Sequence, residues 1–583
     1  MSRHTQYRPP RSSTPPTGRP FELRIPTAPD VPHYKSVLTP VSFLLRAALT
    51  RPTKLAIVHP ERGYHFTYEE WAARVLSLTM ALLHVPGWKR GDRVAMICPN
   101  VPMMADAHYA VLAAGGILTP LNYRNSKKEI HWILQHCQPS VIMVDEQYVD
   151  LVPLDVPSSV KVVVSKDSGG QDPSDAYEAF LDEGYQHWQA SNRSGPLDWL
   201  AVPPVQEEDA TCSLCYTSGT TGHPKGVETT LRGSYLSALS NVIESNVTGE
   251  SVYLWVLPMF HCCGWTFPWA MSAAMGTQYM LRSVNYDRIW DALLHGGVTH
   301  YSGAPTVQLG VVNHPKACRL PQRVCVTVAA SAPTATLLRR MESLNLLPMH
   351  LYGLTETYGP SCRRFFEPAW LALPIEERAK EQAKQGHAYV TGDEVRVVRR
   401  DVPPGQPLQD VARDGKELGE IVMRGNIVMK QYYKDPTATS NATHGNYFHT
   451  GDLAVRHPGG EVQILDRGKD IIISGGENVS SLMVEEELAA HPWIEECAVV
   501  ARPDPKWGEC VHAFVKLSAV GRQTLADQGA KKTEMLSSEV TAFCRVKMSG
   551  FAVPKWFTIL DELPKSSTGK IQKKDLRTRV AKL

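Results

Sequence analysis

The chain has 583 residues, and its 61 Lys and Arg residues nearly balance its 59 Asp and Glu residues, giving a formal net charge of +2. Single hydrophobic cores stop growing near about 250–300 residues, so this length predicts at least two compact domains. The near-neutral charge argues against nucleic-acid binding driven by a strongly basic surface. With 43% hydrophobic and 21% charged residues, the composition is typical of a globular protein and not of a disordered one.

Residues 1–35 differ in composition from the rest of the chain. They contain eight prolines and more basic than acidic residues, without a helical period. Proline fixes φ and removes a backbone donor, so we expect an extended or disordered tail over residues 1–35. The same prolines disfavour the amphipathic helix of a transit peptide, and the start of the chain lacks the apolar region of a secretory signal.

The first predicted elements alternate between helix and strand. Thr67 and Glu70 form a capping-box pattern ahead of a helix that runs to about Leu83. The pattern then predicts strands over 93–98, 116–120 and 140–145, with helices over 103–114 and 127–137 between them. Strands separated by helices of this length are typical of βαβ units in a parallel sheet. The polar, weakly patterned region 155–208 is expected to form loops.

A second α/β segment is expected over residues 210–365. Within it, the stretch between Glu250 and Arg282 has no charged residue and is long enough to cross a bilayer. However, Pro258, Gly264 and Pro268 would break a membrane helix, so we expect a buried strand, a turn and a buried helix around a site.

Two further regions follow. Short alternating segments over 387–465 predict a small antiparallel β unit. The residues after Asp466 number about 115, enough for a separate small domain with helices and strands. The predicted class is therefore α/β, with two α/β lobes and a β unit in a large N-terminal domain, and a small α+β C-terminal domain.

The twelve cysteines are expected to be reduced thiols. Cys212 and Cys215 form a C-x-x-C pair, and Cys262 and Cys263 follow His261. A structural zinc site needs four ligands, and no second C-x-x-C pair is present. Most of these cysteines are therefore interpreted as small buried hydrophobic residues.

The strongest motif is the run Tyr216-Thr-Ser-Gly-Thr-Thr-Gly-His-Pro-Lys-Gly226. Its glycines allow tight turns that bring N–H groups close to a polyanion, and its four hydroxyls and Lys225 suit phosphate oxygens. It is not a Walker A loop, because the spacing G-x-x-x-x-G-K-[ST] is absent.

This run resembles the phosphate loop of the adenylate-forming superfamily, which includes acyl-CoA synthetases, luciferases and the adenylation domains of peptide synthetases. Five further segments match that superfamily's motifs in order, and the resemblance covers about residues 40–580. These segments are Tyr352-Gly-Leu-Thr-Glu-Thr357, Tyr447-Phe-His-Thr-Gly-Asp452, Asp466-Arg-Gly-Lys-Asp470, Ser474-Gly-Gly-Glu-Asn478 and Lys565-Ser-Ser-Thr-Gly-Lys570. The resemblance implies that the protein uses ATP and Mg²⁺, with coenzyme A as a cosubstrate.

The resemblance also implies the site residues. The catalytic set is Lys570, Thr355, Glu356 and His261. Glu356 is the metal ligand, a hard oxygen donor suited to Mg²⁺. The cofactor-binding set is Thr217, Ser218, Gly219, Thr220, Thr221, Gly222, Lys225, Ala330, Ser331, Tyr352, Gly353, Asp452, Arg467, Lys469, Gly475, Gly476 and Glu477.

The roles carried over agree with the chemistry of each side chain. Tyr352 offers a flat face for adenine, Thr355 contacts the α-phosphate, and Asp452 accepts the ribose hydroxyls, with Arg467 beside it. Lys570 offsets the repulsion when a carboxylate attacks the α-phosphorus of ATP. For His261, a role near the acid substrate and a role as a core histidine stay equally open.

The family rotates its small domain between two half-reactions, and Lys469 matches the hinge position. Residues 474–477 would then face the tunnel for the CoA thiol. Met483 and Ala552 depart from the family pattern at this face. The domains expected are a tail over 1–35, an AMP-binding domain over 36–466, a mobile C-terminal domain over 467–580 and a targeting tripeptide over 581–583.

The sequence therefore predicts an ATP-dependent acyl-CoA ligase. A segment over 368–386 resembles an insertion in enzymes for short, medium or unusual carboxylates, and fungal peroxisomal ligases are among the relatives. The alternatives are transfer of the acyl group to a separate carrier protein, or a luciferase-like oxygenase. A non-catalytic nucleotide binder is disfavoured because Lys570 and Glu356 are both present.

The final Ala581-Lys582-Leu583 resembles a peroxisomal address read by an import receptor. Neither a nucleic-acid partner nor a transmembrane segment is expected.

Overall fold

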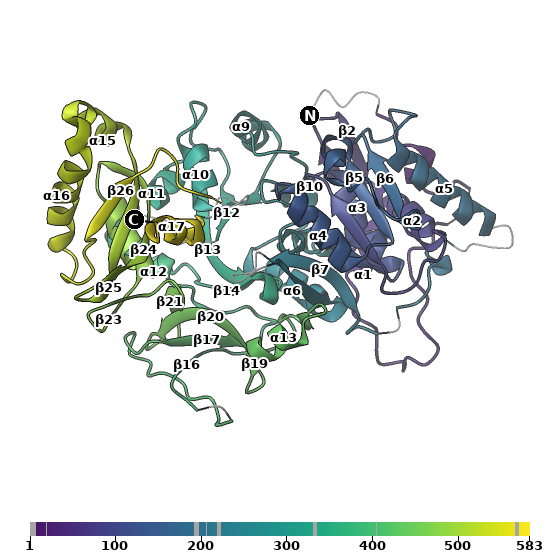
Figure 1. Ribbon diagram of the computed structural model, residues 1–583. Coiled ribbons are helices and arrows are strands. Elements are labelled where there is room, and N and C mark those ends of the chain that lie inside the picture. The colour runs from purple at the N-terminus through teal and green to yellow at the C-terminus, as the bar shows by residue number, and fades with distance from the viewer. Residues whose placement is uncertain are drawn as a thin grey trace. The chain divides into compact units, whose positions relative to one another are not determined.

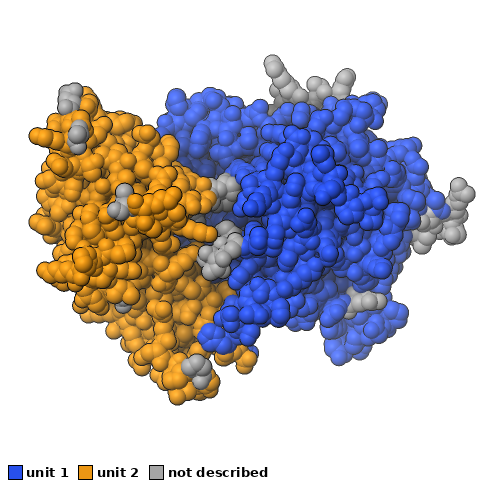
Figure 2. Space-filling model, viewed as in Figure 1, with its two compact units in different colours: residues 1–382, 387–394, 424–444 blue, residues 383–386, 395–423, 445–583 orange. Residues whose placement is uncertain are grey.

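The computed structural model describes residues 7–18, 20–191, 198–205, 207–217, 223–329, 335–403, 405–565 and 571–582. The chain divides into two compact units, shown in blue and orange in Figure 2. Unit 1 comprises residues 1–382, 387–394 and 424–444, and unit 2 comprises 383–386, 395–423 and 445–583. Each unit is described in turn.

The first sheet of unit 1 has the strand order β18-β8-β7-β4-β3-β5-β6. Its strands are β3 (Arg93–Ile97), β4 (Ile117–Pro120), β5 (Val141–Asp145), β6 (Lys161–Ser165), β7 (Thr211–Thr217), β8 (Lys225–Thr230) and β18 (Gln431–Tyr432). The strands from β4 to β6 pair in parallel, whereas β7 and β8 form an antiparallel hairpin. The predicted parallel sheet is confirmed, and its buried strands are apolar because helices cover them.

The helices that precede, separate or follow strands β3 to β6 are α2 (Tyr68–Leu83), α3 (Pro102–Ala113), α4 (Lys127–Cys137) and α5 (Ala176–Ser191), visible in Figure 1. The capping box at the start of α2 is confirmed, because the side chain of Thr67 accepts from Glu70 N while Thr67 N donates to the Glu70 carboxylate at 2.7 Å. The predictions for α3 and α4 agree with the structure to within one residue.

The expectation of loops over 155–208 is wrong, because β6 and α5 lie in this region. Helix α5 packs along α2 and buries four apolar side chains, those of Tyr177, Phe180, Leu181 and Trp188. These four residues recur at helical spacing, but the polar residues between them hide the pattern in the sequence.

Residues 1–35 are expected to be extended or disordered; their described part contains one short 3₁₀ turn and packs against other elements of unit 1. A 3₁₀ turn, η1 (Arg11–Ser13), lies against α2 and α5. Ser77 Oγ donates to the carbonyl of Ser12 at 2.7 Å, and Tyr7 Oη donates to that of Gly169 at 2.7 Å. A partner on the folded body thus satisfies a backbone carbonyl of this proline-rich segment, and the side chain of Tyr7 in turn satisfies the carbonyl of Gly169.

The second sheet of unit 1 has the strand order β15-β14-β13-β12-β11-β9-β10-β1-β2. These strands are β1 (Leu55–His59), β2 (Tyr64–Thr67), β9 (Val252–Leu254), β10 (Thr277–Tyr279), β11 (His300–Ser302), β12 (Val324–Val328), β13 (Leu346–Leu354), β14 (Gly359–Arg363) and β15 (His387–Ala388). The strands from β1 through β10, β9, β11 and β12 to β13 pair in parallel, and β14 turns back antiparallel beside β13.

The remaining helices of unit 1 follow the second sheet or connect it to the first. They are α1 (Val41–Thr50), α6 (Leu231–Glu244), α7 (Cys262–Trp265), α8 (Phe267–Ala273), α9 (Tyr286–His295), α10 (Pro305–Val312), α11 (Ala335–Ser343), α12 (Ile375–Ala383) and α13 (Pro436–Ala442). The uncharged stretch 251–281 contains the predicted strand, turn and buried helix, as β9, α7 and α8, and it ends in a further strand, β10, that was not predicted. Among the described residues, no helix has the length and apolar character needed to cross a membrane.

Unit 2 contains two sheets, the first antiparallel and the second mixed. In the first, β17 (Gly419–Met423) lies between β16 (Val395–Val398) and β20 (Tyr447–Arg456), and β21 (Val462–Arg467) pairs with β20. This confirms the predicted small β unit.

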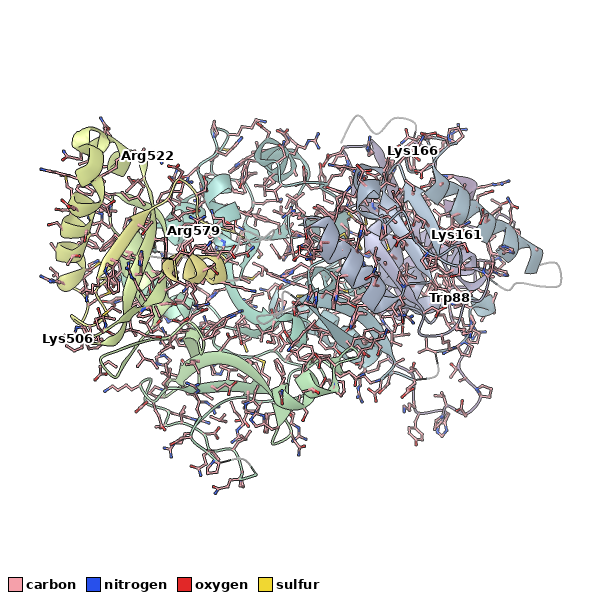
Figure 3. All side chains as sticks on the ribbon, viewed as in Figure 1. Trp88, Lys161, Lys166, Lys506, Arg522 and Arg579 are labelled. Carbon is pink, nitrogen blue, oxygen red and sulfur yellow. The ribbon has the colours of Figure 1, made fainter. Side chains whose placement is uncertain are left out.

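The second arrangement orders its strands β23-β22-β25-β24, with β26 beside β25. Its strands are β22 (Ile472–Ser474), β23 (Glu477–Val479), β24 (Ile494–Asp504), β25 (Gly508–Leu517) and β26 (Trp556–Ile559), and its helices are α14 (Ser481–Ala489), α15 (Ala519–Thr524), α16 (Lys532–Arg545) and α17 (Lys573–Val580). Helix α17, marked by the labelled Arg579 in Figure 3, buries Leu576 and Val580 against this sheet. The α+β character predicted for the last part of the chain is confirmed.

Candidate active site

The hairpin β7–β8 presents the two ends of the predicted phosphate loop side by side. Thr217, the last residue of β7, is paired with Lys225, the first residue of β8. Ser218, Gly219, Thr220, Thr221 and Gly222 lie outside the described residues, as do Ala330, Ser331 and Lys570. The described arms therefore fix where the loop leaves the sheet and where it returns.

Strand β13 ends in the turn that carries Thr355 and Glu356. A 3₁₀ turn, η5 (Thr355–Thr357), follows the strand, and Thr357 Oγ1 accepts a hydrogen bond from Leu354 N at 2.8 Å. At Gly353 an added Cβ would lie 1.8 Å from the carbonyl oxygen of Gly359. Only glycine allows β13 and β14 to approach this closely, which accounts for the glycine in the Tyr352–Thr357 motif.

Tyr358 fastens this turn to the end of the β7–β8 hairpin. Its φ is +64°, and its hydroxyl accepts a hydrogen bond from Thr230 N at 2.7 Å. A Cβ on Gly233, in the first turn of α6, would come within 2.3 Å of the same hydroxyl. Thr230 in turn caps α6 by accepting from Gly233 N at 3.0 Å. The motif around Glu356 and the hairpin around Lys225 are thus held together in unit 1.

A single aromatic side chain contacts both Glu356 and Lys225. Tyr432 Oη donates to Glu356 Oε1 at 2.8 Å, and Lys225 Nζ lies 4.9 Å from the centroid of the Tyr432 ring. Burial raises the pKa of Tyr432, and the neighbouring Glu356 carboxylate raises it further, so the hydroxyl stays protonated and donates.

His261 precedes a strained turn. The next five residues, from Cys262 to Thr266, have φ between +45° and +60°, although only Gly264 among them is a glycine. The left-handed region costs roughly 1–2 kcal/mol per non-glycine residue. Asn241 Nδ2 stabilises the turn by donating to the carbonyl of Trp265 and to Thr266 Oγ1, both at 2.8 Å. Strain of this kind persists only where the surroundings determine it, and it is common at functional sites.

The strained turn also contacts the Thr355 turn. Cys262 Sγ lies 3.2 Å from Thr355 Oγ1. Behind them, Cys215 and Cys263 bring their sulfur atoms within 3.4 Å in a small cavity that Thr355 also lines. A hydrogen bond from the Cys263 thiol lowers the pKa of Cys215, while burial raises that of Cys263. Among the described residues, no group of three or more His, Cys, Asp or Glu side chains is arranged to hold a metal ion.

The aromatic residues near His261 are mostly core. Trp255, Phe267 and Trp269 are at most 1% exposed. Trp255 Nε1 donates to Gln278 and Trp269 Nε1 donates to the carbonyl of His108. Trp265 differs, because its ring lies 3.0 Å from the position of a Cβ at Gly359, directly after the Thr355 turn.

In unit 2, Asp452 and Arg467 face each other on paired strands. Asp452 on β20 is the register partner of Arg467 on β21, and Arg467 Nε lies 3.5 Å from Asp452 Oδ1. Asp452 is 4% exposed, so the guanidinium stabilises a buried carboxylate. The two predicted ribose contacts therefore lie together.

Lys469 lies two residues after Arg467, in the link between β21 and β22. Its carbonyl accepts a hydrogen bond from Arg577 Nη2 on α17 at 3.1 Å, and Arg577 also pairs with Asp470. Burial lowers the pKa of Lys469, as do the positive charges of Arg467 and Arg577.

Gly475 and Gly476 form the turn between β22 and β23, ahead of the exposed Glu477. Their φ values are +63° and +88°, as a tight two-residue hairpin turn requires. The Trp507 ring covers Gly475, where a Cβ would lie 2.7 Å from Trp507 Cε3. Of the two departures from the family pattern, Met483 is 43% exposed, whereas Ala552 is fully buried in the core of this sheet.

The sequence reasoning missed four residues that organise these regions: Asn100, Tyr358, Tyr432 and Arg577. Asn100 holds the segment before His261, because its side chain donates to the carbonyl of Trp255 at 2.8 Å and accepts from Met259 N at 2.7 Å. All four lie far in sequence from the residues they contact, and no local pattern marks them.

Comparison with known proteins identifies the family. The model of the AMP-binding enzyme family matches residues 44–433, and that of the AMP-binding enzyme C-terminal domain matches residues 483–570. The chain belongs to the AMP-binding enzyme family. The resemblance seen in the sequence is thereby confirmed.

Several curated relatives of this family member are named as CoA ligases. The peroxisomal acetate/butyrate–CoA ligase AAE7 of Arabidopsis thaliana is 38% identical, with 95% of this chain and 96% of the relative covered. The acetate–CoA ligase CCL3 of Humulus lupulus is 38% identical, with 94% and 95% covered. The 4-hydroxybutyrate–CoA ligase 2 of Metallosphaera sedula is 38% identical, with 93% and 94% covered. The chain is accordingly an acid–thiol ligase.

Solved structures share the fold. ATP-bound MatB of Rhodopseudomonas palustris superposes with a TM-score of 0.76 at 23% identity, covering 92% of this chain and 98% of that one. The anthranilate CoA ligase AuaEII in complex with anthranoyl-AMP gives a TM-score of 0.76 at 21% identity, covering 95% and 99%. The predicted fold, a large N-terminal α/β domain followed by a small C-terminal domain, is confirmed.

Proposed function

We propose that this chain joins a short- or medium-chain carboxylic acid to coenzyme A in two half-reactions. In the first, the carboxylate attacks the α-phosphorus of ATP, forming an acyl-adenylate and releasing pyrophosphate. In the second, the CoA thiol attacks the acyl carbon, and AMP leaves as the thioester forms. The names of the relatives, which act on acetate, butyrate and 4-hydroxybutyrate, support a small acid.

The observation that carries this proposal is the contact chain from Lys225 through Tyr432 to Glu356. It sets a cation and a carboxylate beside a hairpin whose loop is rich in glycine and hydroxyl groups. Such a set suits a nucleotide triphosphate, because the lysine offsets phosphate charge and the backbone N–H groups bind phosphate oxygens.

Most of the predicted site residues have a proposed part in binding ATP. Residues 217–222 and Lys225 bind the triphosphate, and Thr355 contacts the α-phosphate. Tyr352 packs on adenine, with Ala330 and Ser331 in the opposite wall and Gly353 giving the backbone room. In unit 2, Asp452 accepts hydrogen bonds from the ribose, and Arg467 orients that carboxylate.

Glu356 would hold a magnesium ion. Mg²⁺ prefers one or two carboxylates together with substrate phosphates and water, and Glu356 supplies one carboxylate beside a phosphate-binding hairpin. When bound, the ion neutralises charge on the phosphate oxygens and favours the departure of pyrophosphate. The hydrogen bond from Tyr432 fixes one carboxylate oxygen of Glu356 in this chemistry.

The remaining residues act on the acid, the transition state and the thiol. We propose that His261 orients the acid, since its turn contacts Thr355 through Cys262. Lys570 stabilises the negative charge that spreads during adenylation. Residues 467–580 form a mobile domain that pivots at Lys469. The turn formed by Gly475 and Gly476, together with Glu477, then borders the path of the CoA thiol.

Two further proposals concern the cellular location of the enzyme and its alternative functions. The enzyme acts in the peroxisome: relatives such as AAE7 are named peroxisomal, and Ala581-Lys582-Leu583 suits the import receptor. The second candidate function is transfer of the acyl group to a separate carrier protein, and a luciferase-like oxygenase is the third.

A panel of carboxylic acids tests the function. The purified protein, incubated with ATP, Mg²⁺, CoA and one acid at a time, should release AMP and acyl-CoA in equal amounts for at least one acid of two to eight carbons. Thioester formation on a carrier protein but not on CoA would support the second candidate. Light emission with a luciferin would support the third.

A further inference from the structure

Tyr432 is attached by its backbone to the hairpin that carries Lys225. It lies in the two-residue strand β18, where it is the register partner of Val227 on β8. On either side of it, Lys430 N donates to the carbonyl of Glu228 at 2.8 Å, and Tyr433 N donates to that of Gly226 at 2.7 Å. These bonds fix the position of Tyr432 along strand β8 of the hairpin.

The same segment is attached to the turn that carries Glu356. Met429 N donates to the carbonyl of Glu356 at 2.7 Å, and Tyr432 Oη donates to its carboxylate at 2.8 Å. Backbone and side chain of Glu356 are therefore both held by residues 429–432. All of these residues belong to unit 1.

The Tyr432 ring is suited to hold two opposite charges at once. Its face attracts the Lys225 ammonium, because aromatic faces carry partial negative charge, and its hydroxyl donates to the Glu356 carboxylate. The side chain is only 8% exposed, so little water competes for either contact. The ring thus contacts a cation and a carboxylate that attract each other, and its own contacts compete with a direct ion pair between them.

We propose that Tyr432 is a positioning residue for adenylation, which orients the Glu356 carboxylate toward the metal-bound phosphates and keeps the Lys225 ammonium available to the triphosphate. This inference rests on the proposed function, because it assigns Glu356 and Lys225 to ATP and Mg²⁺. It extends that function by assigning a role to a residue outside the motifs of the site. Tyr432 need not touch the nucleotide to act in this way.

Two substitutions separate the contacts. Tyr432→Phe keeps the ring face and removes the hydroxyl, whereas Tyr432→Leu removes both. Acid-dependent exchange of labelled pyrophosphate into ATP measures the first half-reaction alone. Removing a hydrogen bond to a charged group should lower kcat/KM for ATP about 10- to 100-fold in Tyr432→Phe, and the Mg²⁺ concentration for half-maximal exchange should rise. Tyr432→Leu should raise the KM for ATP further.

The next residue provides a matched control. Tyr433 lies beside Tyr432, and its ring lies 5.0 Å from Lys434 Nζ and 5.6 Å from the His136 ring, neither of which is a predicted site residue. Tyr433→Phe should keep wild-type exchange and wild-type Mg²⁺ dependence. Thioester formation from supplied acyl-adenylate should be unchanged in both Phe variants, because that half-reaction does not use the triphosphate.

The outcomes distinguish the inference from the proposed function. Wild-type protein that shows no acid-dependent exchange overturns the proposed function itself. If the wild-type protein catalyses exchange, and Tyr432→Phe has the same kcat/KM for ATP and the same Mg²⁺ dependence, the role of Tyr432 is overturned and the proposed function stands. Equal loss of both half-reactions in Tyr432→Phe, together with a lower Tm, would also overturn it, because Tyr432 would then be needed only for folding.

Discussion

Arg577 holds the backbone of Lys469 from the last helix of the chain. Its Nη2 donates to the Lys469 carbonyl at 3.1 Å, and its guanidinium pairs with Asp470. Lys469 thus lies two residues after the end of β21, and its carbonyl is fastened to α17. A change in the dihedral angles at Lys469 would leave this bond intact, because the carbonyl oxygen moves with Asp470 and Arg577 on the same side of the pivot.

Lys469→Pro tests the proposed hinge. Proline fixes φ near −65° and removes the freedom that a rotation at this residue needs. We expect the variant to retain acid-dependent pyrophosphate exchange and to lose thioester formation from supplied acyl-adenylate by at least about 100-fold. Lys469→Ala, which removes the side chain and leaves the dihedral angles free, should lose far less. Normal CoA ligation by Lys469→Pro would refute the hinge.

Asp452→Ala tests the proposed ribose contact. The wild-type enzyme should discriminate against 2′-deoxy-ATP and 3′-deoxy-ATP, because the carboxylate would lose a hydrogen bond with either nucleotide. In the variant, KM for ATP should rise about 10- to 100-fold and most of the discrimination should disappear. Steady-state kinetics with the three nucleotides measure this. A variant that weakens all three nucleotides by the same factor would place the ribose elsewhere.

Gly353→Ala tests the close approach of β13 and β14. A Cβ at residue 353 would overlap the carbonyl oxygen of Gly359 at 1.8 Å, and backbone cannot move aside as a flexible side chain can. We expect a loss of roughly 1–3 kcal/mol in the free energy of unfolding. Gly550→Ala is the control, because nothing lies within 4 Å of the added Cβ there. Similar urea midpoints for the two variants would show that the strands have more room than the structure indicates.

His108 predicts acid sensitivity. Burial lowers its pKa from 6.5 to about 4. Between these values the unfolded chain binds a proton that the folded chain does not, so the free energy of unfolding falls as the pH falls from 6.5 toward 4. The loss should be on the order of 2 kcal/mol between pH 6.5 and 5, at about 1.4 kcal/mol per pH unit.

Urea unfolding at pH 6.5 and pH 5 measures this contribution. His108→Gln should lose about 2 kcal/mol less than the wild type between the two values. His33→Gln should behave like the wild type, since His33 is exposed. Burial also lowers the pKa of His512 to about 4, so part of the acid sensitivity remains in His108→Gln. Equal losses in His108→Gln and wild type would contradict the prediction.

Much of the fold was predictable because the sequence carries local signals for it. The Thr67–Glu70 capping box and the alternation over 93–145 depend on neighbours in the chain, and the structure confirms both. Helix α5 was missed because its apolar stripe is narrow and interrupted by charge. The order at residues 7–18 was missed because it depends on partners such as Ser77 and Gly169, which are distant in sequence.

In the candidate site, too, local sequence patterns were predictable and contacts between distant segments were not. Its motif residues could be assigned from their order in the chain and the chemistry of their side chains. The residues that hold the motifs in place could not, because Tyr358, Tyr432 and Asn100 act through contacts between segments far apart in sequence. Nor does the sequence disclose the run of positive φ values after His261, since four of its five residues are not glycine.

Exchange of labelled pyrophosphate into ATP, measured without CoA, tests the central claim most directly. If an acyl-adenylate forms before the thioester, the wild-type enzyme should catalyse exchange that depends on a carboxylic acid such as butyrate and not on CoA. Lys570→Ala should abolish this exchange and still form thioester from supplied acyl-adenylate. Exchange that requires CoA, or cleavage of ATP to ADP and phosphate, would contradict the mechanism.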